Sequence, residues 1–193
     1  MVKAADIDLA VGALRRGLIV GVPTDTVYGI AADPFSESAV RALFTAKDRP
    51  EVMPIPILAA DPAQAARIGD LDEGALTAAA VHWPGALTLV VPRAAGLPAW
   101  IGHPDSGSVG VRVPDHPVTL ALLSLAGPLA VTSANRSGYP PAADDRAARA
   151  ALGDAVAVYL EGGGAGGAAS TVVDMTGSEP RVLRSGPVVW PVA

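Results

Sequence analysis

The chain has 193 residues, half of them apolar, with a net charge of −5 and no cysteine. This length suits one domain with a sizeable core, and the apolar content excludes a disordered chain. The lack of cysteine excludes disulfides and thiolate-bound zinc, and the acidic balance argues against a protein whose whole surface attracts nucleic acid.

The first half of the chain alternates helical and strand-like patterns. We predict helices at residues 7–16, 36–46, 62–68 and 72–82, and strands at residues 18–22, 55–58 and 87–91. Asp6 is expected to cap the first helix at its N-terminus, and Gly17 to follow its C-terminus. Pro50 bounds the second helix, because the residue before a proline avoids the helical conformation.

The second half contains fewer helices between its strands. We predict helices at residues 118–125 and from Asp144 or Asp145 to residue 152, and strands at residues 108–113, 129–132, 156–160, 170–174 and 181–183. Interleaved strands and helices predict an α/β fold. The late strands lack intervening helices, so a mixed sheet is expected. With no linker to divide the chain, residues 1–193 are predicted to form one domain.

The segment P-T-D-T-V-Y-G at residues 23–29 is the strongest candidate site. It follows an apolar strand and places small hydroxyl groups at the strand's end. Lys47 and Arg49 then follow at the end of a predicted helix. A Lys supplies a point charge to a phosphate, and an Arg supplies a bidentate fork. The alternative is a solvated helix end, where cations meet the negative end of the helix dipole.

Further polar residues lie at strand ends or on the polar face of a strand. Arg112 lies on the polar face of the strand at residues 108–113, opposite three valines, and is either a surface residue or a cation inside a cleft. Ser133 and Asn135 follow another strand, where α/β folds place ligands, although turn chemistry also favours these residue types. Ser170 and Arg184 lie beside later strands.

The glycine run at residues 162–167 formally contains G-x-G-x-x-G after a strand. A dinucleotide site needs a helix next, whose N-terminus receives the pyrophosphate. The segment that follows here is β-branched and predicts a strand. A flexible loop or lid is therefore the better interpretation of the run.

Seven motifs occur in order: P-T-D-T-V-Y-G, K-x-R-P, W-P-G-x-L-T-L-V, V-x-V-R-x-P-x-H-P, T-S-A-N-x-S-G, S-T-V-V-D and L-R-x-G. Together they resemble the YrdC/Sua5 family of threonylcarbamoyl-AMP synthases, over about residues 18–186. The resemblance implies a single-domain, twisted mixed sheet flanked by helices, with a concave cationic cleft. The chain resembles the short form of the family, without an extra C-terminal domain.

The resemblance also implies a reaction. L-threonine, bicarbonate and ATP, accompanied by Mg²⁺, would give threonylcarbamoyl-AMP and pyrophosphate by adenylyl transfer. No metal ligand from the protein is expected. A downstream t6A transferase machinery would then carry the threonylcarbamoyl group to adenosine 37 of tRNA. Since no apolar run is long enough to span a membrane and no signal peptide is seen, a cytoplasmic protein without a membrane partner is expected.

Site roles follow from the resemblance position by position. It implies threonine contacts for Thr26, Arg112, Thr132 and Ser170. It implies nucleotide contacts for Lys47, Arg49, Ser108, Ser133, Asn135 and Arg184, with Lys47 and Arg49 as the catalytic pair on the ATP phosphates. The chain departs from the family pattern at Met53 and Leu58, where many members carry a polar residue and a His, which bears on the selectivity for threonine.

Two other functions remain as alternatives. The first is a non-catalytic module that binds double-stranded RNA or tRNA, against which the acidic charge and the scarcity of lysine count. The second is a carbamoyl-transfer domain like those in hydrogenase maturation factors.

Overall fold

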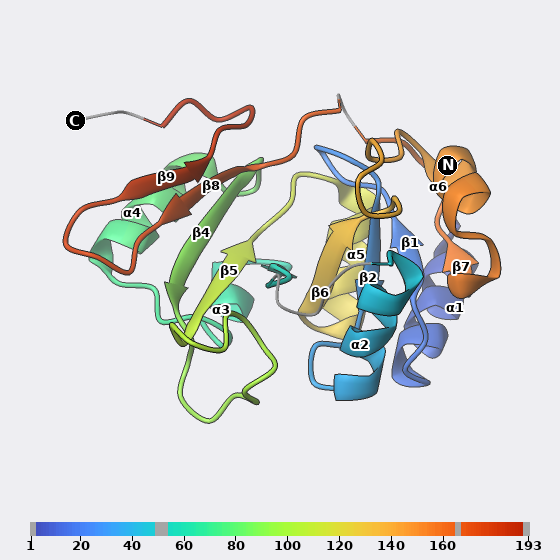
Figure 1. Cartoon of the computed structure of the whole chain (residues 1–193), viewed down its shortest axis with the longest axis horizontal. Coiled ribbons are helices and arrows are strands. Elements are labelled where there is room, and N and C mark those ends of the chain that lie inside the picture. Colours follow the sequence, from blue (N-terminus) through green and yellow to red (C-terminus); the bar gives the residue numbers. More distant parts are fainter. Residues whose placement is uncertain (1–2, 49–53, 165–166, 191–193) are drawn as a thin grey trace.

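The computed structural model describes residues 3–48, 54–164 and 167–190, and these contain one nine-stranded sheet with helices against it (Figure 1). The strands are β1 (Val20–Val22), β2 (Gly29–Ala32), β3 (Ile57–Leu58), β4 (Leu87–Pro92), β5 (Ser108–Arg112), β6 (Leu129–Ser133), β7 (Val158–Tyr159), β8 (Thr171–Asp174) and β9 (Arg181–Arg184). The helices are α1 (Ala4–Arg15), α2 (Glu37–Ala46), α3 (Pro62–Ala65), α4 (Glu73–His82), α5 (Pro117–Ala126) and α6 (Asp145–Leu152), followed by the 3₁₀ turn η1 (Gly153–Ala155).

The sheet is mixed, which confirms the predicted α/β fold class. Its strand order is β7-β1-β2-β6-β3-β5-β4-β8-β9. Three neighbouring pairs are parallel, namely β1 with β7, β3 with β5 and β4 with β8, and the others are antiparallel. The two-residue strand β3 joins two larger halves, which lie at the left and right of Figure 1.

Helices cover both faces of the half that contains β1, β2 and β6. Figure 1 shows α2 in front of these strands and α5 behind them, and α1 packs on α5. Successive strand residues point to opposite faces. Val20 and Val22 therefore join the cluster that includes Leu122 of α5, whereas Ile30 joins the cluster that includes Leu43 of α2.

The Ser or Asp residues directly before α2, α3, α4 and α6 act as N-caps. Ser36 accepts a hydrogen bond from the amide of Ala39 at 3.3 Å, and Asp144 accepts one from the amide of Ala147 at 2.8 Å. Asp144 rather than Asp145 is thus the N-cap of α6. The prediction for α1 was wrong, because α1 begins earlier and Asp6 lies within its first turn. There, Asp6 accepts a hydrogen bond from the amide of Lys3 at 3.1 Å.

One strand of the structure, β2, was not predicted, and several predicted strands are longer than the observed ones. Residues 29–32 are all apolar and buried, so they show no alternation of polar and apolar residues. The strands predicted at residues 55–58 and 156–160 pair over only two residues each. In the described ranges, no helix has the length and apolar character needed to cross a membrane.

Candidate functional site

A cavity of about 180 Å³ lies where the two halves of the sheet meet at β3. Leu58 of β3 lines it, together with residues from the left half, such as Thr88, and from the right half, such as Val131. Six predicted site residues also line it: Thr26, Arg112, Thr132, Ser133, Ser170 and Arg184. The structure therefore brings together residues that are up to 158 positions apart.

Arg112 is the most constrained residue of this cavity. Its Nε donates to the carbonyl oxygen of Gly85 at 2.9 Å, and one terminal nitrogen donates to Oγ1 of Thr26 at 3.0 Å. The other terminal nitrogen donates to Oδ1 of Asp25 at 2.5 Å, within an ion pair whose side chains are only 7% and 13% exposed. Burial lowers the pKa of Arg112, and the Asp25 carboxylate acts in the opposite direction.

Thr26 is fixed by a local hydrogen-bonded turn. The hydroxyl of Thr24 donates to the carbonyl oxygen of Val27 at 2.6 Å and accepts from the amide of Thr26 at 3.2 Å. The two threonine hydroxyls lie 3.0 Å apart. Such side-chain bonds to nearby backbone stabilise a turn. They hold the Thr26 hydroxyl toward Arg112.

Ser170 lies at the opposite side of the cavity, just before β8. Its hydroxyl is 2.8 Å from that of Thr88, and Arg184 donates to both its hydroxyl and its carbonyl oxygen, at 3.1 and 3.0 Å. Gly186 comes so close to this segment that a Cβ atom there would lie 2.4 Å from the carbonyl oxygen of Ala169. The glycine of the L-R-x-G motif thus allows the chain to pass close to Ser170.

Lys47 is buried and bound to the loop at residues 133–135. Its Nζ donates to the carbonyl and side-chain oxygens of Asn135, at 2.7 and 3.0 Å, and to the carbonyl oxygen of Ser133. Lys47 is only 3% exposed, so the interpretation of this residue as a solvated helix end is wrong. Arg49, its predicted partner on the phosphates, lies outside the described residues, as does Met53.

Ser108 lines a neighbouring cavity of about 390 Å³, which shares Thr88 and Arg184 with the first. Its hydroxyl lies 2.7 Å from that of Ser106. Arg181 also lines this second cavity. The two adjoining cavities can accommodate two parts of one bound reactant or two reactants side by side.

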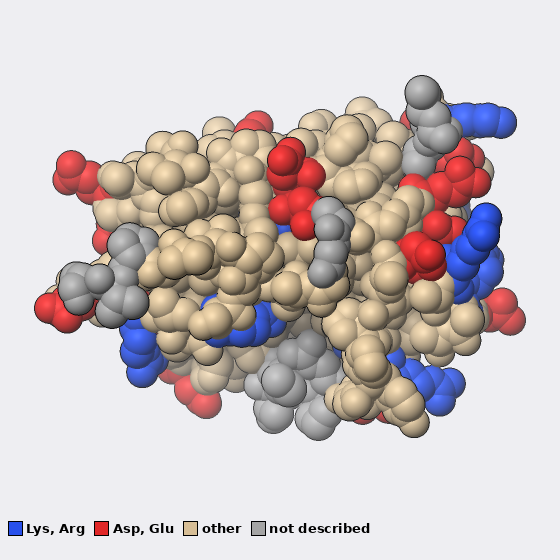
Figure 2. Space-filling model, turned by 90° about the horizontal axis from the view of Figure 1, so that it is seen from above, with Lys and Arg blue, Asp and Glu red and all other residues tan. Residues whose placement is uncertain are grey.

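On the described part of the face in Figure 2, basic and acidic side chains form small groups separated by broad uncharged areas. The described residues contain no cluster of three or more His, Asp or Glu side chains that could hold a metal ion. Mg²⁺ and the cationic character of the cleft therefore stay predictions.

The glycine run packs beside the segment at residues 23–27. Gly164 donates from its amide to the carbonyl oxygen of Ala143 at 2.7 Å, and a Cβ atom on Gly164 would lie 2.7 Å from the carbonyl oxygen of Thr26. No helix follows the run, since Thr171–Asp174 forms β8. The prediction that a strand follows the run is confirmed, whereas the role as a lid stays a prediction.

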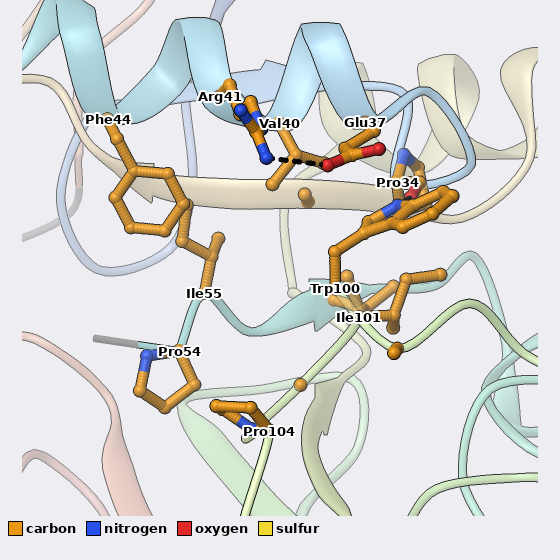
Figure 3. A pocket seen from close by; sticks show the side chains of 14 residues that line it. Pro34, Glu37, Val40, Arg41, Phe44, Pro54, Ile55, Trp100, Ile101 and Pro104 are labelled. Carbon is orange, nitrogen blue, oxygen red and sulfur yellow. Dashed lines mark hydrogen bonds and ion pairs between the residues drawn. The ribbon is translucent and has the colours of Figure 1, made fainter. Parts of the chain in front are cut away.

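A separate apolar pocket of about 180 Å³ lies between α2 and the segment at residues 99–104 (Figure 3). Phe44, Ile55 and Trp100 surround it, and an ion pair of 2.8 Å between Glu37 and Arg41 lies at its edge. Its lining contains none of the predicted site residues that the structure describes. We therefore place the functional site in the cavity around Arg112.

Asp25 and Thr88 were not predicted as site residues. Asp25 occurs within the first motif, but its partner Arg112 is 87 positions away, so no local pattern reveals the pair. Thr88 looks like an ordinary β-branched strand residue. The signal available for Asp25 was a carboxylate among small hydroxyl residues at the end of a buried strand.

Comparison with known proteins gives consistent results. A family model for Sua5, YciO and YrdC proteins, described as telomere recombination, matches residues 12–186. A relative named putative threonylcarbamoyl-AMP synthase from Mycobacterium tuberculosis is 49% identical over 181 residues, which cover 93% of this chain and 83% of the relative. The threonylcarbamoyl-AMP synthase of Vibrio cholerae is 36% identical, covering 84% of this chain and 88% of that protein.

A solved structure shows the same fold. The structure of P. abyssi Sua5 complexed with L-threonine matches with a TM-score of 0.91 at 35% identity, covering 96% of this chain and 55% of that one.

Proposed function

The chain belongs to the Sua5/YciO/YrdC family, and from that membership we infer that it is a threonylcarbamoyl-AMP synthase. The names of the matched relatives favour this enzyme over the RNA-binding module and the carbamoyl-transfer domain. The observation that carries the proposal at the level of the site is the cavity in which Thr26, Arg112 and Ser170 converge. These are the residues to which the sequence motifs assign threonine binding.

The proposed reaction is an adenylyl transfer. The amino group of L-threonine and bicarbonate form a carbamate, N-carboxythreonine, with the loss of water. A carbamate oxygen then attacks the α-phosphorus of ATP. A new oxygen–phosphorus bond forms, the bond to the pyrophosphate oxygen breaks, and pyrophosphate leaves with that electron pair. The attacking group is already anionic and needs no general base. The protein then contributes mainly position and charge, as is usual in phosphoryl chemistry.

Each predicted residue has a task in this reaction. Arg112 would pair with the threonine carboxylate, assisted by the hydroxyls of Thr26 and Ser170 and by Thr132. Arg49 and Lys47 would neutralise the triphosphate, together with Mg²⁺ bound to the phosphate oxygens. The remaining contacts to the nucleotide would come from Ser108, Ser133, Asn135 and Arg184.

Lys47 would act on ATP differently from a lysine on an open surface. An ammonium group has three N–H donors, and the carbonyl oxygens of Ser133 and Asn135 and the side chain of Asn135 accept from it. The positive charge would therefore act from behind the loop, while the loop presents Ser133 and Asn135 to the nucleotide. The proposed role combines charge with positioning.

Mass spectrometry of the product tests the function directly. With ATP, bicarbonate, Mg²⁺ and L-threonine we expect threonylcarbamoyl-AMP and an equal amount of pyrophosphate, with neither formed when threonine or bicarbonate is left out. Pyrophosphate release at the same rate with and without threonine would contradict the proposal. Turnover of carbamoyl phosphate in place of threonine and bicarbonate would instead identify the carbamoyl-transfer domain. Strongly salt-dependent RNA binding without ATP turnover would identify the RNA-binding module.

The product would be an activated intermediate for a tRNA-modifying partner. A mixed anhydride of a carbamate and AMP hydrolyses readily, so direct transfer to the next enzyme is advantageous. A cytoplasmic location and contact with that machinery are part of this proposal.

A further inference from the structure

We propose that Asp25 is a positioning residue that orients Arg112 toward the carboxylate of the amino-acid substrate. The inference rests on the proposed function, since it assumes that Arg112 binds threonine. Asp25 has no assigned role in that reaction. Its hydrogen bond to Arg112 is nevertheless short, at 2.5 Å, and joins two side chains that are only 7% and 13% exposed.

The hydrogen bonds of Arg112 leave two of its N–H donors available for a ligand. A guanidinium group has five N–H donors. Gly85, Thr26 and Asp25 each accept one of them, from three different nitrogens. Two N–H groups remain, one on each terminal nitrogen, and the described residues supply no acceptor for either. Two donors are what a carboxylate accepts in a bidentate pair.

Asp25 differs from the other two acceptors in strength. A charged acceptor makes a shorter and stronger hydrogen bond than a carbonyl or a hydroxyl oxygen. Arg112 is only 6% exposed, and a buried guanidinium without a counterion is unfavourable. Asp25 therefore both stabilises the charged side chain in the cavity and selects its rotation about the last side-chain bonds.

The segment that carries Asp25 is itself held firmly. On one side, the hydroxyl of Thr119 in α5 donates to the carbonyl oxygen of Pro23. On the other side, the Thr24 hydroxyl bonds to Val27 and Thr26, as described above. A carboxylate on such a fixed turn can impose its position on Arg112, and not the reverse.

Two opposing effects follow from removing the carboxylate. Loss of a fixed orientation weakens binding of the threonine carboxylate, whereas loss of the negative charge removes a repulsion. We expect orientation to dominate, because the hydrogen bond between Asp25 and Arg112 is short, whereas the substrate would pair with N–H groups that Asp25 does not use. The direction of the change in affinity distinguishes the two effects.

The test measures binding of L-threonine and of L-threonine amide, which lacks the carboxylate, to the purified full chain by calorimetry. For Asp25→Ala we expect the threonine Kd to rise by about 10- to 100-fold, as for the loss of a charged hydrogen bond. The amide should bind both proteins nearly equally, so the preference for threonine over the amide collapses. The Kd for ATP, measured in the same way, should change less than about twofold. Glu37→Gln, which removes a carboxylate from the exposed ion pair with Arg41, is the matched control and should leave every value unchanged.

A second variant keeps the test decisive if Asp25→Ala does not fold. Asp25→Asn retains an oxygen acceptor without the charge, and its preference for threonine should lie between those of wild type and Asp25→Ala. An unchanged preference, or tighter threonine binding in either folded variant, would overturn the proposal. If the wild-type protein itself binds no threonine, the failure lies with the proposed function and not with Asp25.

Discussion

Replacing Lys47 with Ala is expected to lower kcat/KM for ATP by about 100-fold or more, by analogy with the loss of a group that stabilises a transition state. The change removes the positive charge near the phosphates and releases the loop that carries Ser133 and Asn135. Initial rates of threonine-dependent pyrophosphate release at varied ATP measure this change in kcat/KM. Lys3→Ala is the matched control, because Lys3 is the chain's other lysine and is exposed.

The same substitution is also expected to destabilise the protein. Removing the ammonium group takes a donor from the backbone and side-chain oxygens of the buried Asn135, at a cost of about 1–3 kcal/mol for each group left unsatisfied. Thermal unfolding would show a lower Tm for Lys47→Ala than for Lys3→Ala. A folded variant with undiminished kcat/KM would contradict both the charge and the positioning role.

Replacing Arg112 with Lys is expected to raise the KM for L-threonine by about 100-fold while retaining the charge. Lysine has one nitrogen in place of three and cannot bond Gly85, Thr26 and Asp25 while also pairing with a carboxylate. Steady-state kinetics at saturating ATP and varied threonine measure the effect, and the KM for ATP should change little.

Arg41→Lys provides the control for this exchange. Arg41 forms its ion pair on the exposed surface of α2, where such pairs contribute little. A threonine KM for Arg112→Lys within about twofold of wild type would show that charge alone suffices, since a twofold change is only about 0.4 kcal/mol.

Much of the fold could be predicted because its local signals are strong. Ser36, Asp72 and Asp144 precede apolar helical patterns, and each caps the helix that follows it. The strand β2 could not be predicted, since its four residues are all apolar and buried and show no alternation of polar and apolar positions. Its burial depends partly on β6, which pairs with it from about 100 positions further along the chain.

Most residues that form the site could be predicted from the sequence, but the hydrogen bonds between them could not. Motifs identified Thr26 and Arg112, yet the hydrogen bond that joins them spans 86 positions. Lys47 illustrates the limit most clearly. The sequence shows a cation at the end of a helix, and only the folded chain shows that its ammonium group is enclosed by the loop at residues 133–135.

The burial of Lys47 has a practical consequence for labelling chemistry. The chain contains two lysines, and in the folded state an acylating reagent can reach the exposed Lys3 but not Lys47, which is 3% exposed. Acylation of Lys47 requires the loop at residues 133–135 to move away from α2. The mass added at this one position therefore records how often the loop opens, and ligands that hold the loop in place slow the reaction without affecting Lys3.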